Sequence, residues 1–230
     1  MMREMLSVMI ATYNEEKNIE KLIYSIRQQL SKINQENEII VADANSRDRT
    51  REIAEKARVK VFVRKDPRFG SFLKEGIQRA KGDYIITMDS DFSHDPKYLI
   101  DLWNHRNDAD IIIASRWIQG GGSNQSPSRI FLSKRLNGIY NLFLKTGVKD
   151  LNSNFRIYHK KIFSEINLDG KEFDILPELI VKAKRNGFST KEIPFFFNDR
   201  KRGKSKMKIL KHTISYLKKL IELSFGSNGF

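Results

Sequence analysis

Two aspartates separated by a single residue, Asp89 and Asp91, are the side chains of this sequence best suited to chemistry. They follow an apolar run at 84–88 that is expected to form a strand. Because side chains alternate along a strand, residues two apart share one face, so both carboxylates can point the same way. Two carboxylates this close repel each other unless a hard cation lies beside them. Mg²⁺ or Mn²⁺ commonly fills this role by bridging the carboxylates to a substrate phosphate. Taken alone, the pair favours a solvated turn that carries two acids.

The first half of the chain alternates apolar runs with helical patterns. Strands are expected at 6–11, 38–42, 59–63, 84–88 and 109–114. Helices are expected at 15–30, 49–57, 69–80 and 97–105. Continuous apolar strands separated by helices indicate an α/β fold, a mostly parallel sheet with helices on both faces. The ligand site of such a sheet lies beyond the carboxyl ends of its strands.

The polar residues that could form a site follow these strands directly. They fall at 12–15, 43–46, 89–91 and 115–116, which favours one site over four unrelated turns. The first strand is followed by neither a Gly-x-Gly-x-x-Gly motif nor a Walker loop, which disfavours a dinucleotide-binding or P-loop enzyme. The glycine-rich stretch 119–127 is interpreted as a mobile lid beside the site, with a plain linker as the alternative.

The second half is expected to hold helices at 129–144 and 174–185 and a strand at 190–197. The first of these helices carries an apolar stripe of Leu132, Leu136, Ile139, Tyr140 and Phe143. A C-terminal amphipathic helix is predicted from a second stripe of Met207, Leu210, Ile214, Leu217 and Ile221. From the stripe alone, packing of this helix on the core is favoured. Because lysines flank the helix, the alternative is that it lies on an anionic membrane. We expect residues 1–200 to form the catalytic domain, and 201–230 a basic loop and membrane-proximal helix extending it.

The amino-acid composition limits the classes of partner that the protein could bind. The formal net charge of +14 predicts an anionic partner: nucleic acid, phospholipid or a phosphorylated substrate. Nucleic acid is disfavoured because the Asp89 and Asp91 carboxylates would repel its backbone. The absence of cysteine excludes disulfides and thiolate sites and fits a reducing compartment. Neither a signal peptide nor an apolar run of the roughly 20 residues that span a bilayer is found, so any membrane contact is expected to be peripheral.

Six motifs in order resemble the family 2 glycosyltransferases of the GT-A (nucleotide-diphospho-sugar transferase) fold. They lie at 11–15, 38–43, 88–91, 113–122, 150–156 and 192–206. Each motif is weak alone, but their order is specific, and the last three are most similar to dolichyl-phosphate mannose synthases and other polyprenyl-phosphate glycosyltransferases. Ala44 stands where that pattern has an acid, Ser93 where it often has glutamine, and Asn154 where it usually has glycine.

The resemblance implies a donor site for a nucleotide-diphosphate sugar. Its expected residues are Ala11, Tyr13, Glu15, Asp43, Asp89 and Arg200. Within this set Asp43 would accept hydrogen bonds from the base, and Asp89 and Asp91 would hold Mg²⁺ or Mn²⁺ against the diphosphate. Arg200, in the basic loop, would close over the same diphosphate with its planar fork of donors. Asp91 and Arg200 are therefore the expected catalytic residues.

The acceptor implied by the resemblance is a dolichyl or polyprenyl phosphate, held by Arg116, Arg129 and Ser133. From the pattern alone, Arg129 and Ser133 are equally compatible with the start of a surface helix. A phosphate is already anionic and needs no general base, whereas a hydroxyl does. Glu178 is the candidate acid/base for a hydroxyl acceptor, or else simply an exposed surface carboxylate.

The expected activity is metal-dependent, inverting transfer of mannose from GDP-mannose to the lipid phosphate. It is expected at the cytoplasmic face of a membrane, where a small membrane-protein subunit is a candidate partner. The alternatives are a UDP-glucose-using polyprenyl-phosphate glucosyltransferase, a family 2 enzyme acting on a glycan hydroxyl, a nucleic-acid-binding protein, and a non-catalytic membrane-surface binder.

Overall fold

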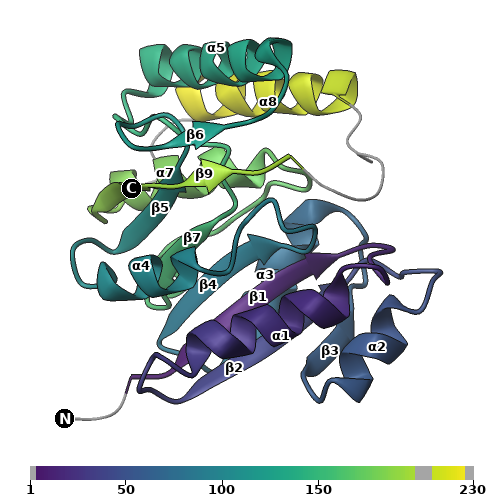
Figure 1. Ribbon diagram of the computed structural model, residues 1–230. Helices are drawn as coiled ribbons and strands as arrows, with labels where there is room; N and C mark the ends of the chain where they lie inside the picture. Colours follow the sequence, from purple (N-terminus) through teal and green to yellow (C-terminus); the bar gives the residue numbers. More distant parts are fainter. Residues whose placement is uncertain (1–3, 200–208, 226–230) are drawn as a thin grey trace.

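The computed structural model describes residues 4–199 and 209–225, with the side chains of the last helix described from residue 215. A seven-stranded sheet runs through the molecule in the order β3-β2-β1-β4-β7-β5-β8 (Figure 1). Its strands are β1 (Leu6–Thr12), β2 (Asn37–Asp43), β3 (Lys60–Val63), β4 (Tyr84–Asp89), β5 (Ile111–Ser115), β7 (Arg156–His159) and β8 (Thr190–Pro194). A second, two-stranded sheet pairs β6 (Gly122–Ser123) with β9 (Phe196–Phe197).

Helices cover both faces of the large sheet. They are α1 (Ile19–Leu30), α2 (Thr50–Lys56), α3 (Phe69–Arg79), α4 (Tyr98–Asn104), α5 (Pro127–Leu144), α6 (Ile162–Glu165), α7 (Ile175–Arg185) and α8 (Ile209–Phe225). The two-residue alternation of β1 separates the two cores: Val8 and Ile10 pack with α1, α2 and α4, whereas Met9 packs with α3, α6 and α7. The predicted α/β architecture, a mostly parallel sheet covered on both faces, is confirmed.

One strand of the large sheet was not predicted from the sequence. β7 lies between β4 and β5 and is antiparallel to both, pairing Thr87 with Arg156 and Ile111 with Tyr158. The other neighbouring pairs are parallel. Because β7 is antiparallel to its neighbours, it begins at the carboxyl ends of the parallel strands, and the residues just before Arg156 therefore lie at that edge.

Two predicted boundaries are wrong. The helix expected from residue 15 begins at Ile19, because residues 13–18 form turns that bond to the loop after β2. The single strand expected at 190–197 is divided into β8 and β9. At the break, the Phe195 N–H donates to Ser115 O at 3.1 Å, and its carbonyl accepts from Gly122 N at 3.1 Å. The chain thus passes from the large sheet to the small one.

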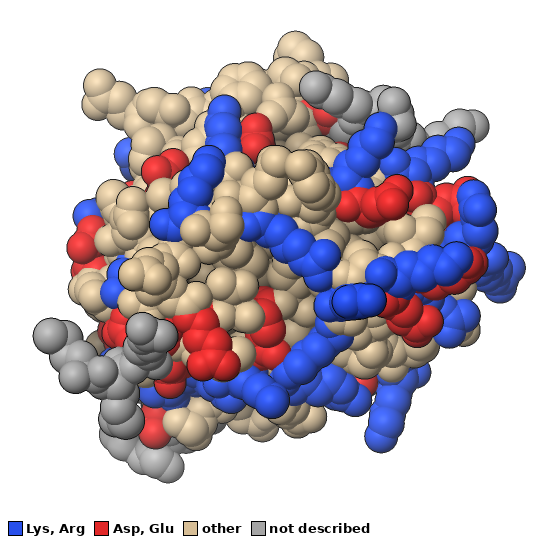
Figure 2. Space-filling model, turned by 60° about the horizontal axis from the view of Figure 1, so that its bottom comes forward, with Lys and Arg blue, Asp and Glu red and all other residues tan. Residues whose placement is uncertain are grey.

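Charge is distributed rather than concentrated over the face that Figure 2 presents. Lysine and arginine side chains there are interspersed with aspartate and glutamate side chains. Some of the surface charges of the protein form ion pairs, such as Lys56 with Glu52 at 2.6 Å. Although the chain has a net charge of +14, its basic side chains do not form one continuous basic patch on this face.

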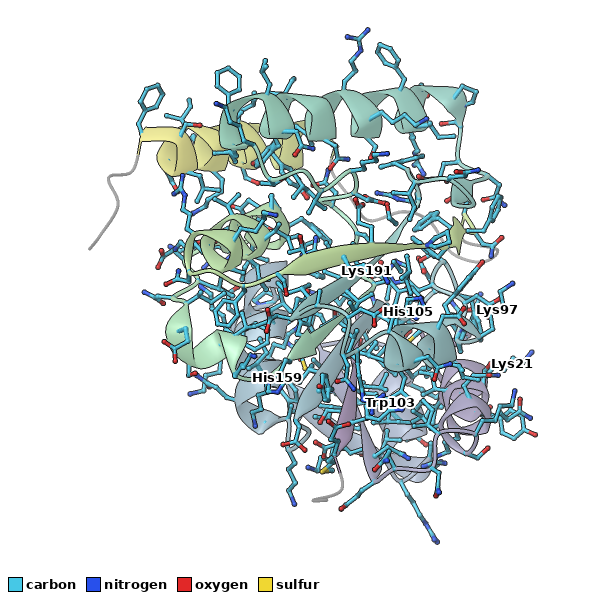
Figure 3. The ribbon with its side chains drawn as sticks, turned by 90° about the vertical axis from the view of Figure 1, so that its left-hand side faces the viewer. Lys21, Lys97, Trp103, His105, His159 and Lys191 are labelled. Carbon is cyan, nitrogen blue, oxygen red and sulfur yellow. The ribbon has the colours of Figure 1, made fainter. Side chains whose placement is uncertain are left out.

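The helices α5 and α8 lie side by side above the rest of the molecule (Figures 1 and 3). Most of the apolar stripe predicted for α5 faces away from the core, although Tyr140 is buried and Leu136 packs against the core. Of the predicted stripe, Leu132, Ile139 and Phe143 are exposed. Side chains of α5 project away from the sheet in Figure 3.

The described part of α8 shows the same reversal. Its buried residues are Tyr216, Lys219, Leu220 and Leu223, whereas Leu217 and Ile221, both in the predicted stripe, are exposed. The side chains of the other stripe residues lie outside the described residues. The sequence thus predicted both helices, but not which side of each meets the protein.

Candidate active site

Strand register assembles the candidate site at the carboxyl edge of the sheet. Parallel pairing places Ala11 of β1 beside Asp89 of β4, and Thr12 beside Asp43 of β2. Three residues predicted to bind the donor therefore lie on three adjacent strands. Ligands of open α/β sheets bind at this edge.

The loops after β1 and β2 are fastened to one another. The backbone N–H groups of Asn14 and Glu15 donate to Ser46 Oγ at 2.8 Å and Thr50 Oγ1 at 2.7 Å. Asn14 has φ = 53°, in the left-handed region that asparagine tolerates better than most residues. Tyr13, beside it, is 39% exposed at the rim of the site. The two loops thus form one preorganised wall beside Asp43.

Asp43 itself is fully buried. Its Oδ1 accepts hydrogen bonds from Thr12 Oγ1 at 3.1 Å and Ser46 Oγ at 2.5 Å, and its Oδ2 accepts from Ser46 N at 2.7 Å. Arg51 Nε lies 3.9 Å from Oδ2. The carboxylate therefore organises the wall in this structure, and its role in reading the base stays a prediction.

The turn after β4 is held in an uncommon conformation. Phe92 has φ = 63°, which is rare for a bulky residue and is typically found where a functional turn demands it. Ser93 N donates to Asp91 Oδ1 at 3.0 Å. Asp91 is 8% exposed, whereas the Asp89 side chain is 36% exposed. The turn thus presents the two predicted cation ligands from a rigid support.

A buried histidine supports this turn from beneath. His94 Nδ1 accepts the Asp89 N–H at 3.0 Å, and His94 Nε2 lies 3.7 Å from Asp89 Oδ2. Burial lowers the pKa of His94, outweighing the opposite effect of Asp89 and Asp91. The ring is therefore neutral near neutral pH, with its proton on Nε2, and it orients Asp89 without neutralising it.

The residues present fit a divalent cation that is shared with a substrate. Two buried oxygens next to the carboxylates, Ser93 Oγ and Asn154 Oδ1, have no hydrogen-bond partner among the residues that the structure describes. Across those same residues there is no group of three or more Asp, Glu, His or Cys gathered as a self-sufficient metal site. A hard cation at Asp89 and Asp91 would therefore complete its oxygen shell from water and from the substrate diphosphate.

The predicted acceptor residues lie beyond β5. Arg116 donates through Nε at 2.8 Å and Nη2 at 2.7 Å to the two oxygens of Asp150, which is fully buried. Burial alone would lower the pKa of Arg116, but the Asp150 carboxylate outweighs it and raises that pKa. Arg129 Nη1 lies 3.7 Å from Asp199 Oδ1, with both side chains about two-fifths exposed. Ser133, one turn along α5, is half-buried.

Glu178 is a structural carboxylate in this fold, and the alternative of an exposed surface residue is wrong because it is fully buried. Its two oxygens accept from the backbone N–H groups of Asp169 at 3.0 Å and Gly170 at 2.7 Å. Lys182 Nζ lies 2.7 Å and Lys219 Nζ 3.9 Å from the same carboxylate. A base held by two amides and two ammonium groups is poorly placed to remove a proton.

Sequence reasoning missed three buried residues around the site: His94, Asn154 and Arg64. Arg64 follows β3 and bonds its backbone N–H to Asp43 O at 2.8 Å. Burial lowers the pKa of Arg64, and its Nε has no partner within the described part of the chain. His94 and Arg64 could have been signalled only by their position just after strand ends, whereas Asn154 was visible as a departure from the motif but was given no role. Arg200 lies outside the described residues.

This fold, with a carboxylate pair at the carboxyl edge of the sheet beside a preorganised loop wall, has the GT-A architecture. The model of the family described as glycosyl transferase family 2 matches residues 7–166, and the chain belongs to that family. The resemblance read from the six motifs is thereby confirmed.

Two curated relatives are similar over most of the chain. A dolichol-phosphate mannosyltransferase of Pyrococcus furiosus is 35% identical over 211 residues, covering 88% of this chain and 59% of that protein. A polyprenol monophosphomannose synthase of Mycolicibacterium smegmatis is 30% identical over 215 residues, covering 87% of this chain and 80% of that protein. The chain thus spans only 59% of the length of the first relative.

Solved structures share the fold. A glucosyl-3-phosphoglycerate synthase of Mycobacterium tuberculosis, in complex with Mn²⁺, UDP and glucosyl-3-phosphoglycerate, superposes with a TM-score of 0.74 at 17% identity. The match covers 96% of this chain and 80% of that chain. The same enzyme in complex with Mg²⁺ and UDP gives a TM-score of 0.75.

Proposed function

We propose that this protein is an inverting glycosyltransferase that transfers mannose from GDP-mannose to a dolichyl or polyprenyl phosphate. The names of the two curated relatives support the lipid-phosphate acceptor and the sugar. The observation that carries the choice is the state of Glu178: the candidate base for a hydroxyl acceptor is locked by two backbone amides and two lysines. An acceptor that needs no base is therefore favoured.

The proposed reaction is a single displacement at the anomeric carbon. An oxygen of the acceptor phosphate forms a bond to C1 of the sugar while the bond from C1 to the β-phosphate oxygen breaks. The nucleoside diphosphate leaves with the electron pair, and C1 is inverted. No proton has to be removed from the nucleophile, because a phosphate monoester carries about −1.5 to −2 charges at pH 7.

The residues divide between donor and acceptor. Asp89 and Asp91 would hold Mg²⁺ or Mn²⁺, which would neutralise the charge that builds on the leaving diphosphate. Tyr13 and the loop wall anchored at Asp43 would enclose the nucleoside, together with Ala11 and Glu15. Arg116 would hold the acceptor phosphate while its Nε and Nη2 stay on Asp150. Arg129 and Ser133 would extend that phosphate site, and Arg200 would close over the diphosphate.

A lipid extraction assay tests this function. Purified protein and Mn²⁺ are incubated with labelled GDP-mannose or UDP-glucose and a short polyprenyl phosphate, with the corresponding uncharged polyprenol as the matched acceptor. Metal-dependent label in the organic phase is expected from GDP-mannose with the phosphate acceptor only. Label from UDP-glucose would favour the glucosyltransferase alternative. Label on a water-soluble saccharide, or on the polyprenol, would contradict the phosphate acceptor.

We also propose that the protein works at a membrane surface through α5 and α8. Exposed apolar residues gather on these two helices: Phe131 (60%), Leu142 (73%) and Phe143 (60%) on α5, and Ile221 (59%) and Phe225 (84%) on α8. Exposed basic residues, such as Lys134, Arg135 and Lys218, lie among them. An apolar surface with basic neighbours suits the headgroup region of an anionic bilayer. The cytoplasmic side of that membrane stays a prediction.

Binding to vesicles tests this surface. The triple variant Phe131→Ser/Leu142→Ser/Phe143→Ser is expected to bind phosphatidylglycerol vesicles at least about tenfold more weakly, since burying even one such side chain contributes about 1.5–3 kcal/mol. The control is Tyr24→Ser, which removes a 64% exposed ring from α1. Equal co-sedimentation of the triple variant and the control would contradict the membrane surface and favour a membrane-protein subunit as the partner. In the described part of the chain no helix is long and apolar enough to cross a bilayer.

A further inference from the structure

The residue Asn154 stands opposite Asp89 because β7 runs antiparallel to β4. The register pairs Tyr84 with His159 and Thr87 with Arg156, and two further steps bring Asp89 opposite Asn154. Two hydrogen bonds agree with this extension: Thr87 Oγ1 donates to Asn154 O at 2.6 Å, and Asn154 Nδ2 donates to Asp89 Oδ1 at 3.0 Å. Asparagine here replaces the glycine that is usual in the motif, so the side chain is a feature of this sequence.

The other end of the Asn154 amide is unused. The residue is 3% exposed, and its Oδ1 has no hydrogen-bond partner among the described residues. A buried carbonyl oxygen without a donor is costly, so such an atom calls for a ligand. Within the described part of the chain, the amide side chain makes one hydrogen bond, and that bond leads directly to a predicted cation ligand. The missing donor is therefore best supplied from the cation site.

Two side chains flank the Asp89 carboxylate, one at each oxygen. Asn154 donates to Oδ1, and the His94 ring lies 3.7 Å from Oδ2. That ring stacks on Phe155, the residue after Asn154, at 4.9 Å between centroids and 8° between planes. Among the described residues, no lysine or arginine forms an ion pair with Asp89. The surroundings therefore orient this carboxylate while leaving its negative charge available to a cation.

We propose that Asn154 is a positioning residue of the cation–diphosphate site. Its Nδ2 fixes Oδ1 of Asp89, and its buried Oδ1 accepts a hydrogen bond from a water molecule bound to the cation. Mg²⁺ and Mn²⁺ sites built from few carboxylates retain such waters. Groups that orient cation ligands typically change metal affinity 10- to 100-fold when removed. The inference rests on the proposed function, because it assigns the residue to that function's cation.

Binding of Mn²⁺ in the presence of GDP or UDP tests the role without turnover. Free Mn²⁺ is measured by its electron paramagnetic resonance signal, for the wild type, Asn154→Ala and Asn154→Gly. Both variants are expected to bind Mn²⁺ about tenfold more weakly. The control is Asn152→Ala, two residues earlier in the same loop and only half-buried, which is expected to match the wild type. Melting temperatures without metal are recorded in parallel.

A third variant makes the test independent of folding losses. Asn154→Asp would place another carboxylate beside Asp89, so it is expected to bind Mn²⁺ without nucleotide more tightly than the wild type and to be stabilised by Mn²⁺ to a greater extent. Unchanged Mn²⁺ affinity in all three Asn154 variants would overturn the role of Asn154 alone, even if their melting temperatures fell. Failure of the wild type itself to bind Mn²⁺ with either nucleotide would overturn the cation site, and with it both proposals.

Discussion

Exchange of Asp91 for asparagine is expected to lower sugar transfer on the order of 10²- to 10³-fold, as is typical when one group that stabilises developing charge is removed. Asparagine keeps the shape of the side chain and an oxygen that can accept the Ser93 N–H, a bond of 3.0 Å in the wild type. It removes one of the two charges that would hold the cation against the leaving diphosphate. The rate is measured as label entering the organic phase from GDP-mannose at saturating Mn²⁺.

The matched control is Asp95→Asn, four residues further along the same turn. Asp95 accepts the Lys97 N–H at 3.0 Å and lies 3.8 Å from Lys97 Nζ at the surface, so its charge is not directed at the site. The melting temperature of Asp91→Asn without metal is expected to stay close to that of the wild type, because the amide oxygen can still accept the Ser93 N–H. Full activity of Asp91→Asn would contradict the cation assignment, whatever its stability.

The strand-end part of the site was predictable from the sequence for a simple reason. The parallel strands β1, β2 and β4 are apolar runs buried on both faces, and the polar residue that follows each run must emerge at the same edge. Thr12, Asp43 and Asp89 come together on that basis alone. Burial of Asp43 was not predictable, because it depends on Ser46 turning back onto the carboxylate.

The strand β7 escaped prediction for a physical reason that also hid Asn154. It has four residues, and its first, Arg156, is fully buried although it carries a charge. That guanidinium donates to the backbone carbonyls of Leu176 at 3.0 Å and Leu151 at 2.6 Å, groups that local sequence does not place nearby. A charged residue in a segment of four residues does not predict a buried strand, so the local sequence pattern indicates a loop here. Its pairing with Thr87, 69 positions earlier, is a tertiary effect.

The sequence predicted the helices α5 and α8, but the apolar stripe of each helix did not show which side meets the protein. An apolar stripe ordinarily marks the core side of a helix, yet Phe143 and Ile221 are exposed. Tyr140, a member of the α5 stripe, is buried and joins the two helices, because its Oη donates to Tyr216 O at 2.6 Å. The rule fails here because it assumes that a side chain faces either the protein core or water, and a membrane surface is a third environment. A helix pair that leaves its apolar residues outside is consistent with the lipid acceptor of the proposed function.

Removal of Arg116 is expected to be the most damaging change at the acceptor end of the site. Arg116→Ala leaves the fully buried Asp150 carboxylate without the guanidinium that contacts both of its oxygens. Breaking a buried pair from one side typically costs about 3–5 kcal/mol of unfolding free energy. Urea unfolding should register that loss, and transfer to polyprenyl phosphate should fall with it.

A double variant separates the two roles of this arginine. Arg116→Met/Asp150→Asn removes both charges, while the amide oxygen introduced at position 150 can still accept the backbone N–H of residue 116, as Asp150 does at 3.0 Å. Replacing a buried ion pair with neutral groups of similar size is often close to neutral for stability, so most of the lost unfolding free energy should return. Transfer to the lipid phosphate should not return, because the Arg116 guanidinium that would hold the acceptor phosphate is missing. A stable double variant with the wild-type KM for polyprenyl phosphate would show that Arg116 serves only to support Asp150, and the acceptor phosphate would then have to be held by Arg129 and Ser133 alone.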